Sequence, residues 1–421
     1  MKIFYLSLTA VVVLTAHSAM AQAQAQQSSN GNNHIKIENS GVYIGEGAEA
    51  KGHYTNGTKS VAVGKNAKVA ESGVAVGFEA NAAHEGATAV GKTAKAQSYA
   101  VAMGYQANAN TQSIAMGKDA KANGIQSVAL GDEAQTTGNF TLAFGRKAKA
   151  KGEASLAFGV ESLASGGWAN ALGREAKAEG LLSTAFGWQA HASGERSQAF
   201  GAGAEAKGSR SVSIGNFVKS TGNNSTSIGN DIFNSGNYSI SIGNSNKVDK
   251  NQTVVVGNNI QNTAENSVFL GDSSAYVEKG DTTGGIGKVD GNYAGVEAKG
   301  VVSVGSKGNE RRIQNVAAGL LSHQSTDAVN GSQLHATNQR LEEVNKDAKA
   351  GIAAAMAFKD VPFVPGKWSY AAGAAHYSSE SAVSLNLGRT SNDGKWAVSG
   401  GMSSDSRGRI GFRVGISGVF N

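Results

Sequence analysis

A four-residue pattern of one apolar, one small, one apolar and one glycine residue recurs along the first two thirds of the chain. It is VAVG up to Gly64, IAMG up to Gly117 and VFLG up to Gly271, and from Gly117 onward it returns every 14 residues. Large apolar positions alternate with small ones, as Val61 and Val63 do, which is typical of strands rather than helices. A second short alternation and a turn rich in Gly, Ser or Asn complete each unit. We therefore predict two strands of about five residues per unit.

These units predict a parallel β-solenoid in which each unit is one coil. A single coil cannot bury its own apolar face, so the coils must stack on one another. We expect the repeated glycines to close the corners, where a side chain would clash or φ must be positive. An earlier copy, VYIG up to Gly45, is interpreted as a capping turn. The alanines in the middle of most units fill little volume, so we expect an exposed apolar face that other chains cover.

The regular period ends in the last third of the chain. Residues 272–299 are rich in Gly, Asp and Thr and are expected to be irregular, before a strand-like segment at 301–305. Residues then recur in a heptad pattern that includes Leu334, Leu341 and Val344. This pattern predicts a short helical stalk of under about 40 Å. The alternative is an amphipathic helix on a globular domain.

The C-terminal segment predicts four strands of about 9–11 residues. Apolar residues occupy every second position from Ile410 to Ile416, and aromatic residues lie near the strand ends, as Trp368 and Tyr377 do. This is the signature of membrane β-strands. Four strands cannot close a barrel, and an open sheet edge in lipid is very costly, so we expect three chains to share a barrel of twelve strands. The alternative is a soluble antiparallel sheet.

One face of the first of these strands carries only small residues. They are Ser369, Ala371, Gly373 and Ala375. The segment before this strand, residues 350–357, is also composed mostly of small residues. We therefore expect several helices to pass through the barrel, and we expect Gly373 to face its lumen.

Composition narrows the classes of protein to which the chain can belong. It has 421 residues, of which 57 are glycine, 2 are proline and none is cysteine, and its formal net charge is +6. The lack of cysteine excludes disulfides, thiolate zinc sites and a cysteine nucleophile. The scarcity of proline excludes collagen, which needs both proline and glycine.

The first residues predict export from the cell. An apolar run at residues 3–13 follows a single lysine and precedes a small-x-small sequence, which is typical of a secretory signal. We expect the signal to occupy residues 1–21 and to be cleaved after Ala21, with Ala23 or Ala25 as alternatives.

Lysine recurs at the fourth position after the repeat glycine in alternate coils. The members of this lysine row are Lys68, Lys95, Lys121, Lys149 and Lys177. With neighbouring strands about 4.8 Å apart, in-register stacking would place these cations roughly 9–10 Å from one another. One interpretation is that the alternation separates like charges and keeps the surface soluble. The other is a binding site for anions, namely sulfated glycans or acidic matrix proteins, at which many weak contacts add up.

The sequence shows no constellation of catalytic or metal-ligating residues. Its eight histidines are scattered, without an HExxH pattern or a cluster with ligand spacing. Residues 284–290 are interpreted as a glycine-rich loop rather than a calcium-binding repeat. We therefore predict no enzyme, no cofactor, no metal site and no nucleic-acid partner.

Together, these segments resemble the YadA-type trimeric autotransporter adhesins over nearly the whole chain. The VAVG and IAMG units at 14-residue steps are similar to the head repeats of that family. Residues 311–319, followed by 327–330 and 333–334, resemble its neck motif. Residues 345–421 resemble its C-terminal membrane anchor. The chain departs from the family in that the aromatic Phe420 is penultimate, whereas family anchors usually end in an aromatic residue.

The resemblance implies a mainly β homotrimer with a head of left-handed parallel β-rolls, a short α-helical neck and coiled-coil stalk, and a C-terminal outer-membrane β-barrel. Each chain would give four strands to that twelve-stranded barrel. The implied segments are a signal peptide (1–21), an N-terminal segment (22–44), the head (45–271), a head insert and pre-neck (272–310), the neck (311–333), the stalk and pore helix (334–360) and the anchor (361–421). The residues implied in the neck and in trimerisation are Arg312, Ile313, Asn315, Val316, Asp327, Val329, Asn330, Leu334, Leu341 and Val344.

The resemblance also implies a function. It predicts a bacterial surface adhesin that inserts into the outer membrane as a trimer and binds host extracellular matrix or cells by multivalent contacts. The partners that the resemblance implies are collagen, fibronectin or laminin, together with the outer-membrane assembly machinery. Sulfated glycans are expected from the lysine row, and outer-membrane lipid from the four terminal strands. The alternative is a structural or shielding coat that mediates autoagglutination and serum resistance.

Overall fold

The computed structural model describes residues 34–38, 41–50, 59–82, 84–278 and 293–419. Their contacts divide the chain into two compact units. The first contains the repeats and ends at Arg311, and the second contains the residues from Arg312 onward together with residues 293–296. The cleavage site predicted at Ala21, the loop at 284–290 and Phe420 lie outside the described residues.

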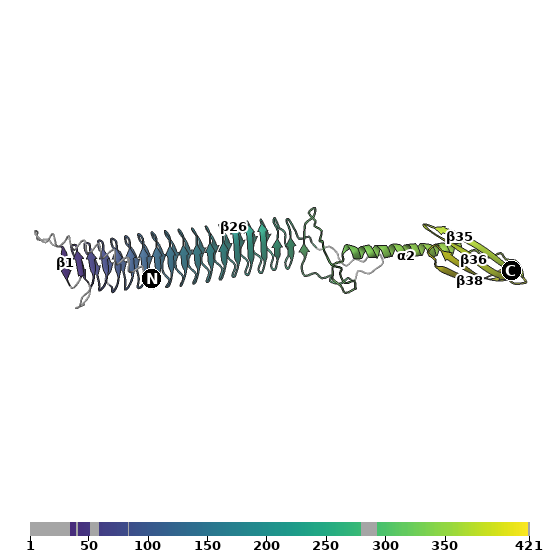
Figure 1. Cartoon of the computed structure of the whole chain (residues 1–421), viewed down its shortest axis with the longest axis horizontal. Helices are drawn as coiled ribbons and strands as arrows, with labels where there is room; N and C mark the ends of the chain where they lie inside the picture. Colours follow the sequence, from purple (N-terminus) through teal and green to yellow (C-terminus); the bar gives the residue numbers. More distant parts are fainter. Residues whose placement is uncertain (1–33, 39–40, 51–58, 83, 279–292, 420–421) are drawn as a thin grey trace. The chain divides into compact units, whose positions relative to one another are not determined.

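The longer strands of the coils form one sheet, in which successive coils stack in chain order (Figure 1). They are β2 (Gly41–Ile44), β4 (Val61–Val63), β6 (Val74–Val76), β8 (Thr88–Val90), β10 (Val101–Met103), β12 (Ile114–Met116), β14 (Val128–Leu130), β16 (Leu142–Phe144), β18 (Leu156–Phe158), β20 (Asn170–Leu172), β22 (Thr184–Phe186), β24 (Gln198–Phe200), β26 (Val212–Asn216), β28 (Thr226–Asn230), β30 (Ile240–Asn244), β32 (Val254–Val256), β33 (Val268–Leu270) and β34 (Val302–Ser303). Each pairs in parallel with the next, so that Ala115 lies opposite Ala129 and Ala129 opposite Ala143. The parallel solenoid predicted from the repeats is confirmed.

The shorter strands form the second sheet of the solenoid, also with parallel pairing. They are β3 (Glu49–Ala50), β5 (Lys68–Val69), β7 (Asn81–Ala82), β9 (Lys95–Ala96), β11 (Asn108–Ala109), β13 (Lys121–Ala122), β15 (Gln135–Thr136), β17 (Lys149–Ala150), β19 (Leu163–Ala164), β21 (Lys177–Ala178), β23 (His191–Ala192), β25 (Glu205–Ala206), β27 (Lys219–Ser220), β29 (Phe233–Asn234) and β31 (Lys247–Val248). Backbone hydrogen bonds run from coil to coil: Lys121 N donates to Ala134 O and Gly131 N to Met116 O, both at 2.8 Å. Each coil is therefore stabilised mainly by its two neighbours.

The start of the solenoid differs from the prediction. The unit that ends at Gly45 is not merely a capping turn, because β2 pairs in parallel with β4 and β3 pairs in parallel with β5. Another strand, β1 (Ile35–Glu38), runs antiparallel to β2 and covers the edge of the sheet that precedes the first coil. An antiparallel cap of this kind occupies backbone groups that would otherwise template unwanted strand pairing.

Most strands are shorter than the five residues expected from the pattern. Most strands of the coils contain three residues in the first sheet and two in the second, whereas β2 has four, β34 has two, and β26, β28 and β30 have five. The missing residues belong to the turns, where positions such as Asp119 (φ 56°) and Gln126 (φ 53°) adopt the left-handed conformation. The turns at the two corners of each coil therefore contain more residues than the alternation of side chains predicts.

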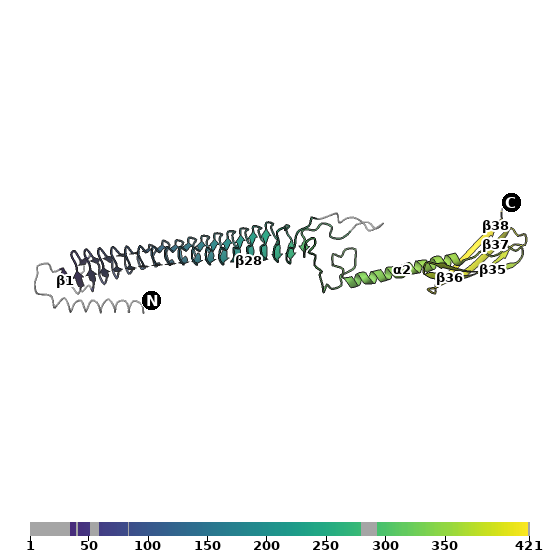
Figure 2. The same ribbon diagram turned by 90° about the horizontal axis from the view of Figure 1, so that it is seen from above.

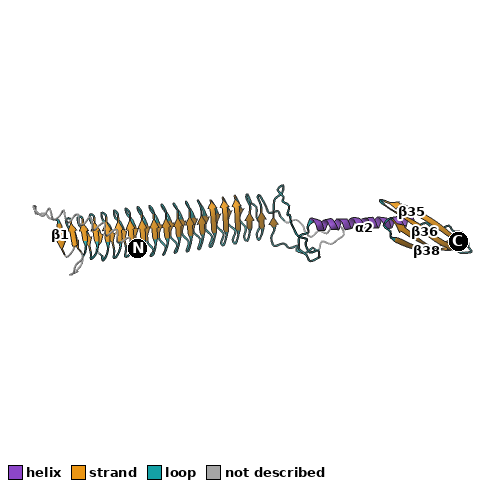
Figure 3. Cartoon of the chain, viewed as in Figure 1, coloured by secondary structure: helices purple, strands orange, loops and turns teal. Residues whose placement is uncertain are grey.

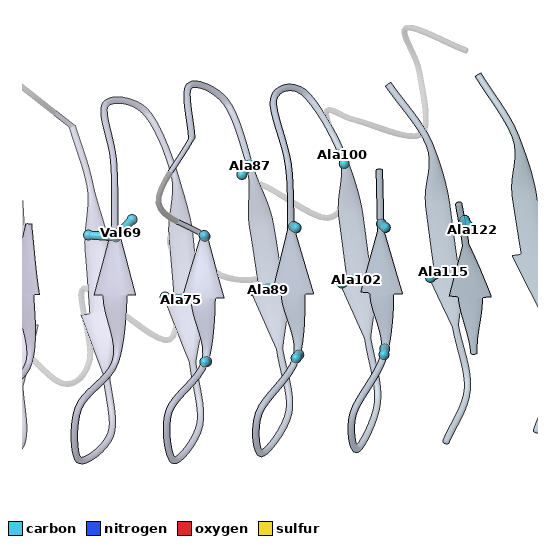
Figure 4. Packing of buried hydrophobic residues seen from close by; sticks show 14 of the residues in the cluster. Val69, Ala75, Ala87, Ala89, Ala100, Ala102, Ala115 and Ala122 are labelled. Carbon is cyan, nitrogen blue, oxygen red and sulfur yellow. The ribbon is translucent and has the colours of Figure 1, made fainter. Parts of the chain in front are cut away.

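Alanine fills the interior of the coils. Ala102, Ala115 and Ala122 are inaccessible to solvent, and Figure 4 shows such residues at matching places on successive coils. The two sheets lie so close together that a methyl group suffices to fill the space between them. Later coils contain bulkier buried side chains, including Val218 and Phe269.

The repeat glycines close one corner of each coil, as predicted. From Gly64 to Gly271 their φ angles lie between +96° and +156°. A Cβ on Gly145 would come within 2.5 Å of the carbonyl oxygen of Gly159 in the next coil. Backbone conformation and space therefore both require glycine at this corner.

The second unit joins a helix to a four-stranded antiparallel sheet. The helix is α2 (Gly331–Ala357), and the strands are β35 (Trp368–Tyr377), β36 (Glu380–Thr390), β37 (Trp396–Asp405) and β38 (Ile410–Gly418). Figure 3 shows the helix in purple leading to the four orange strands, and Figure 2 labels the same elements from above. The end of α2 packs on the sheet through Ala353, Ala354 and Ala357, which meet Ala382. The predicted helix and four terminal strands are confirmed.

Candidate ligand-binding surface and anchor

The longer strands turn their large side chains outward, away from the alanine interior. In the single chain, 43% of Phe144, 48% of Phe158 and 53% of Phe186 is accessible to solvent. Phe144 and Phe158 stack across neighbouring coils with ring centroids 4.8 Å apart. We call this surface, formed by the first and third residues of the three-residue strands from β4 to β33, the apolar face. An apolar surface that continues over so many coils is typical of an interface between chains.

The lysine row lies in register on the opposite sheet of the solenoid. Asn108 pairs with Lys95 on one side and with Lys121 on the other, so one uncharged residue separates successive lysines. Among the described residues, no carboxylate lies within ion-pair distance of any of the five lysines. Four of them, Lys95, Lys121, Lys149 and Lys177, are exposed, and Lys68 is half-buried. Their ammonium groups are accessible, while their role in ligand binding stays a prediction.

Acidic residues interrupt the series of lysines after Lys177, and lysine returns at the same position of the coil at Lys219 and Lys247. His191 Nε2 lies 2.8 Å from a carboxylate oxygen of Glu179. One coil later, the carboxylate of Glu205 lies 2.6 Å from Lys207 Nζ and 3.0 Å from Lys219 Nζ. Partial burial raises the pKa of Glu205, but hydrogen bonds and charges from the two lysines outweigh it and hold this pKa below its ordinary value.

The lowered pKa of Glu205 predicts that the repeats lose stability in acid. A carboxyl with a lower pKa in the folded state stabilises the fold above its ordinary pKa, and this contribution disappears as the pH falls through the folded value. We expect the thermal midpoint of the repeats to fall below about pH 4.3, and to fall less in Glu205→Gln. Circular dichroism melts of both proteins over this pH range measure the difference. Equal pH dependence in the two would contradict the prediction.

Polar side chains hold the predicted neck segment against the start of α2. Asn330 caps the helix by accepting from Gln333 N at 3.2 Å, and its Nδ2 donates to the Val316 carbonyl at 3.1 Å. Gln333 brackets Gly319, since its Nε2 donates to Gly319 O at 2.7 Å and its Oε1 accepts from Gly319 N at 3.0 Å. Asp327 accepts from the backbone N–H of Leu320 at 2.9 Å. All three residues lie in the segments predicted to form the neck, whereas the contact of Gln333 with Gly319 is visible only in the structure.

The other predicted neck and stalk residues have exposed side chains in the single chain. Exposed apolar members include Ile313 (71%), Leu341 (66%) and Val344 (46%). The remaining members are Arg312, which is exposed, Asn315, which has a φ of 60°, and the exposed Val316, Val329 and Leu334. So many solvated apolar side chains along one helix and the segment before it agree with the predicted association of chains.

The terminal sheet has two unlike faces. Val383, Leu385 and Leu387 on β36 are more than half exposed, while Ser384 and Asn386 between them are buried on the side of α2. On β38 the apolar side chains are still more exposed, with 82% of Val414 accessible. An apolar outer face and a polar, helix-covered inner face are the alternation expected of a strand in a membrane barrel.

Gly373 lies beneath the end of α2. A Cβ at this position would overlap the Ala357 carbonyl oxygen and approach Cγ of Lys359 to 2.9 Å. The hydroxyl of Ser384 donates to the same carbonyl at 2.6 Å. The helix therefore crosses the small-residue face of β35, and the place of Gly373 in the lumen of a complete barrel stays a prediction.

Ion pairs join α2 to the turn between β37 and β38. Asp347 Oδ1 on the helix lies 2.5 Å from Arg407 Nε and 3.6 Å from Arg409 Nη1. Arg409 also reaches Asp405, with its Nε 3.1 Å from Oδ2. These contacts hold the middle of the helix against this end of the sheet.

No group of three or more His, Cys, Asp or Glu side chains in the described part of the chain is arranged to hold a metal ion. Over the same residues, no helix has both the length and the apolar content needed to cross a membrane.

Three models of protein families match segments of this chain, and these segments include most of the repeats, the helix and the terminal sheet. A model described as "YadA head domain repeat (2 copies)" matches seven stretches between residues 69 and 259, and "Coiled stalk of trimeric autotransporter adhesin" matches residues 312–355. A "YadA-like membrane anchor domain" matches residues 362–420. Together these matches cover more than half of the chain, in the order of the family. The chain belongs to the YadA-type trimeric autotransporter adhesins. Its C-terminal sheet is the outer-membrane anchor, and its repeats belong to the surface-exposed passenger.

This family member matches only short segments of its named relatives. The trimeric autotransporter adhesin AtaA of Acinetobacter sp. (strain Tol 5) is 49% identical over 85 residues, which is 20% of this chain and 2% of the relative. The autotransporter adhesin BtaE of Brucella suis biovar 1 (strain 1330) is 60% identical over 53 residues, which is 13% of this chain and 7% of the relative. The matched regions thus span only a small part of either relative. The collagen-binding domain of the Yersinia adhesin YadA is 24% identical, with a TM-score of 0.30, over 51% of this chain and 98% of that domain.

The sequence analysis missed a second row of residues on the repeats of this adhesin-family chain. It occupies the position directly after the repeat glycine and alternates between cationic and aromatic side chains in five successive coils. We call it the corner row: Lys65, Phe78, Lys92, Tyr105 and Lys118. The same period of two coils that revealed the lysine row would have revealed this one.

Proposed function

We propose that this protein is a surface adhesin that works as a homotrimer and binds host matrix proteins or sulfated glycans through many weak contacts along its repeats. The observation that best supports this proposal is the lysine row, in which accessible cations recur in register on alternate coils and, among the residues that the structure describes, have no carboxylate within ion-pair distance. A regular array multiplies weak contacts with an extended ligand, because each further contact forms within an existing complex. Collagen, fibronectin and laminin are the matrix proteins to test first.

Two incomplete surfaces support the homotrimer. The first is the apolar face of the repeats, where side chains as large as Phe186 are half exposed. The second is the four-stranded sheet, which is too small to close on itself in lipid. Three copies would cover the first surface and supply twelve strands to the second. Insertion of such a barrel would require outer-membrane lipid and the outer-membrane assembly machinery as partners.

The full-length chain displayed on a non-adherent Gram-negative host tests this function. We expect the cells to bind wells coated with collagen, fibronectin, laminin or heparin, and detergent-extracted protein to have the mass of three chains by light scattering. Cells that bind none of these ligands but agglutinate one another would overturn adhesion and favour a coat. A folded monomer in detergent would overturn the trimer.

The matched substitutions concern the lysine row. Replacing Lys95, Lys121 and Lys149 together by Gln is expected to weaken heparin binding by about tenfold or more, since three of the five recurring contacts are lost. A control with the same loss of charge replaces Lys250, Lys299 and Lys307, which are exposed outside the row. Equal weakening in the two variants would mean that net charge, and not the row, governs binding.

A further inference from the structure

The corner row and the lysine row carry their cations on the same coils. In the coils that begin at Gly64, Gly91 and Gly117, a lysine directly after the glycine accompanies another lysine three residues later. The pairs are Lys65 with Lys68, Lys92 with Lys95, and Lys118 with Lys121. The coils between them carry Phe78 with Asn81 and Tyr105 with Asn108. Two-coil periodicity therefore applies to a strip of surface that extends from the corner onto the shorter-strand sheet.

Lys92 is the centre of this strip. Its ammonium lies 5.7 Å from the ring centroid of Phe78 and 5.9 Å from that of Tyr105, one coil to either side. Both rings are about two-fifths exposed, so a ligand in solution can reach them. Attraction between the cation and the two rings holds the three side chains as one unit on the surface.

Lys92 differs from the other two lysines of the corner row in its charged neighbours. Lys65 pairs with Glu46 at 2.8 Å, and Lys118 lies 3.8 Å from Asp119. Among the described residues, Lys92 has no carboxylate within ion-pair distance, and the same holds for Lys95 beyond it. The strip therefore has an unneutralised centre between two aromatic rings.

We propose that this strip binds a linear anionic polysaccharide that runs along the repeats, with its sulfate or carboxylate groups on the lysines and its sugar rings against Phe78 and Tyr105. The inference rests on the proposed function and names the class of ligand. The cations recur roughly 9–10 Å apart, twice the strand spacing, which is comparable with the length of one disaccharide. A pyranose ring offers an apolar face to an aromatic ring, and a charged disaccharide repeats both features at a fixed interval.

An acidic protein segment fits these observations less well. Its carboxylates do not recur at an interval fixed by covalent structure, and it has no regularly repeated flat apolar face to place between cations. Single-stranded nucleic acid has both charge and flat rings, and aromatic side chains do stack on its bases. Its charges recur at every nucleotide, however, and thus more closely than the cations of the strip. The two alternatives are separate outcomes of the experiment below.

The test uses cells that display the full-length chain and a length series of heparin-derived oligosaccharides, beginning with the disaccharide. Affinity is expected to rise with length until the oligosaccharide spans the paired cations. A variant with Phe78→Ala, Lys92→Gln and Tyr105→Ala is expected to lose affinity on the order of tenfold. The matched control makes the same three kinds of change at the opposite corner, with Phe140→Ala, Tyr238→Ala and Lys250→Gln, and is expected to bind as the unmodified chain does. Head-specific antibody verifies equal display.

The results that would contradict the inference differ from those that would contradict the proposed function. Unchanged heparin binding by the corner variant, or equal loss in the control, would overturn the inference while leaving adhesion intact. A stronger response to a single-stranded oligonucleotide or an acidic peptide than to heparin would assign the strip to that class and overturn the polysaccharide. Binding to no matrix protein and no glycan, even by the unmodified chain, would be a failure of the proposed function itself. Loss of the trimer in the corner variant alone would place the rings in the contact between chains and overturn their role as a binding surface.

Discussion

Replacing Gly131 by alanine is expected to lower the unfolding temperature of the repeats around it well below the unfolding temperature of the unmodified protein. Gly131 has a φ of +134°, which residues with a side chain rarely adopt, and a Cβ would lie 2.5 Å from the carbonyl oxygen of Gly145 in the next coil. Backbone strain of this kind alone costs on the order of 1–3 kcal/mol, and the collision adds to it because the neighbouring backbone cannot move without breaking coil-to-coil hydrogen bonds. Thermal unfolding of the full-length chain, followed by circular dichroism, measures the effect.

The same change at Gly167 is the control. Gly167 is also in the repeats, but its φ is not in the left-handed range, and the nearest atom to an added Cβ is the Cδ1 of Leu181 at 3.3 Å, the end of a flexible side chain. We expect Gly167→Ala to shift the unfolding midpoint only slightly. Equal midpoints for Gly131→Ala and Gly167→Ala would show that the corner tolerates a side chain and would contradict the requirement for glycine at this corner.

Gly373→Val is expected to abolish most surface display. The added side chain would occupy the place of the Ala357 carbonyl, where the end of α2 crosses β35, and so would separate the helix from the sheet. In a barrel shared by three chains the collision would occur three times. We expect display to fall by about tenfold or more, as large collisions in packed regions commonly exceed 1.4 kcal/mol per site. Head-specific antibody on intact cells measures display, and total protein in the membrane fraction measures expression.

Gly400→Val is the matched control for this anchor variant. Gly400 lies on the exposed side of β37, and the nearest atom to an added Cβ is the carbonyl oxygen of Arg413 at 3.8 Å, an ordinary contact. A valine there adds apolar surface on the face expected to meet lipid, so display should be retained. Normal display of Gly373→Val, or equal loss in both variants, would contradict a specific role for the small-residue face.

The repeat and anchor could be predicted from sequence because their signals are local and repeated. Glycine every 14 residues, with alternating side chains before it, identifies one corner and one strand in every coil, and the structure places both as predicted. The strands of the anchor were predictable for the same reason, since Trp368 and Tyr377 mark the two ends of β35. Strand length in the coils was not predictable, because left-handed turn residues such as Gln126 have ordinary side chains.

The contacts between charged and aromatic side chains on the surface could be identified only from the folded structure. The sequence shows Glu205 at the fourth position after the repeat glycine, where the lysine row has its lysines. Only the structure shows that its carboxylate pairs with Lys207 in its own coil and with Lys219 in the next coil. The same holds for Lys92, whose two aromatic neighbours are 14 and 13 residues away in the chain and become adjacent only when coils stack. Side chains distant in sequence meet across coils, and whether their charged ends touch depends on rotamers and on local turns.

By itself, the sequence determined that this chain is a stack of short strands followed by a helix and four amphipathic strands, because backbone geometry and side-chain alternation act over a few residues. Only the tertiary structure decided which faces remain open, which lysines have no carboxylate nearby in the described part of the chain, and which carbonyl lies over Gly373. Those properties depend on distances between residues far apart in the chain, and packing sets these distances.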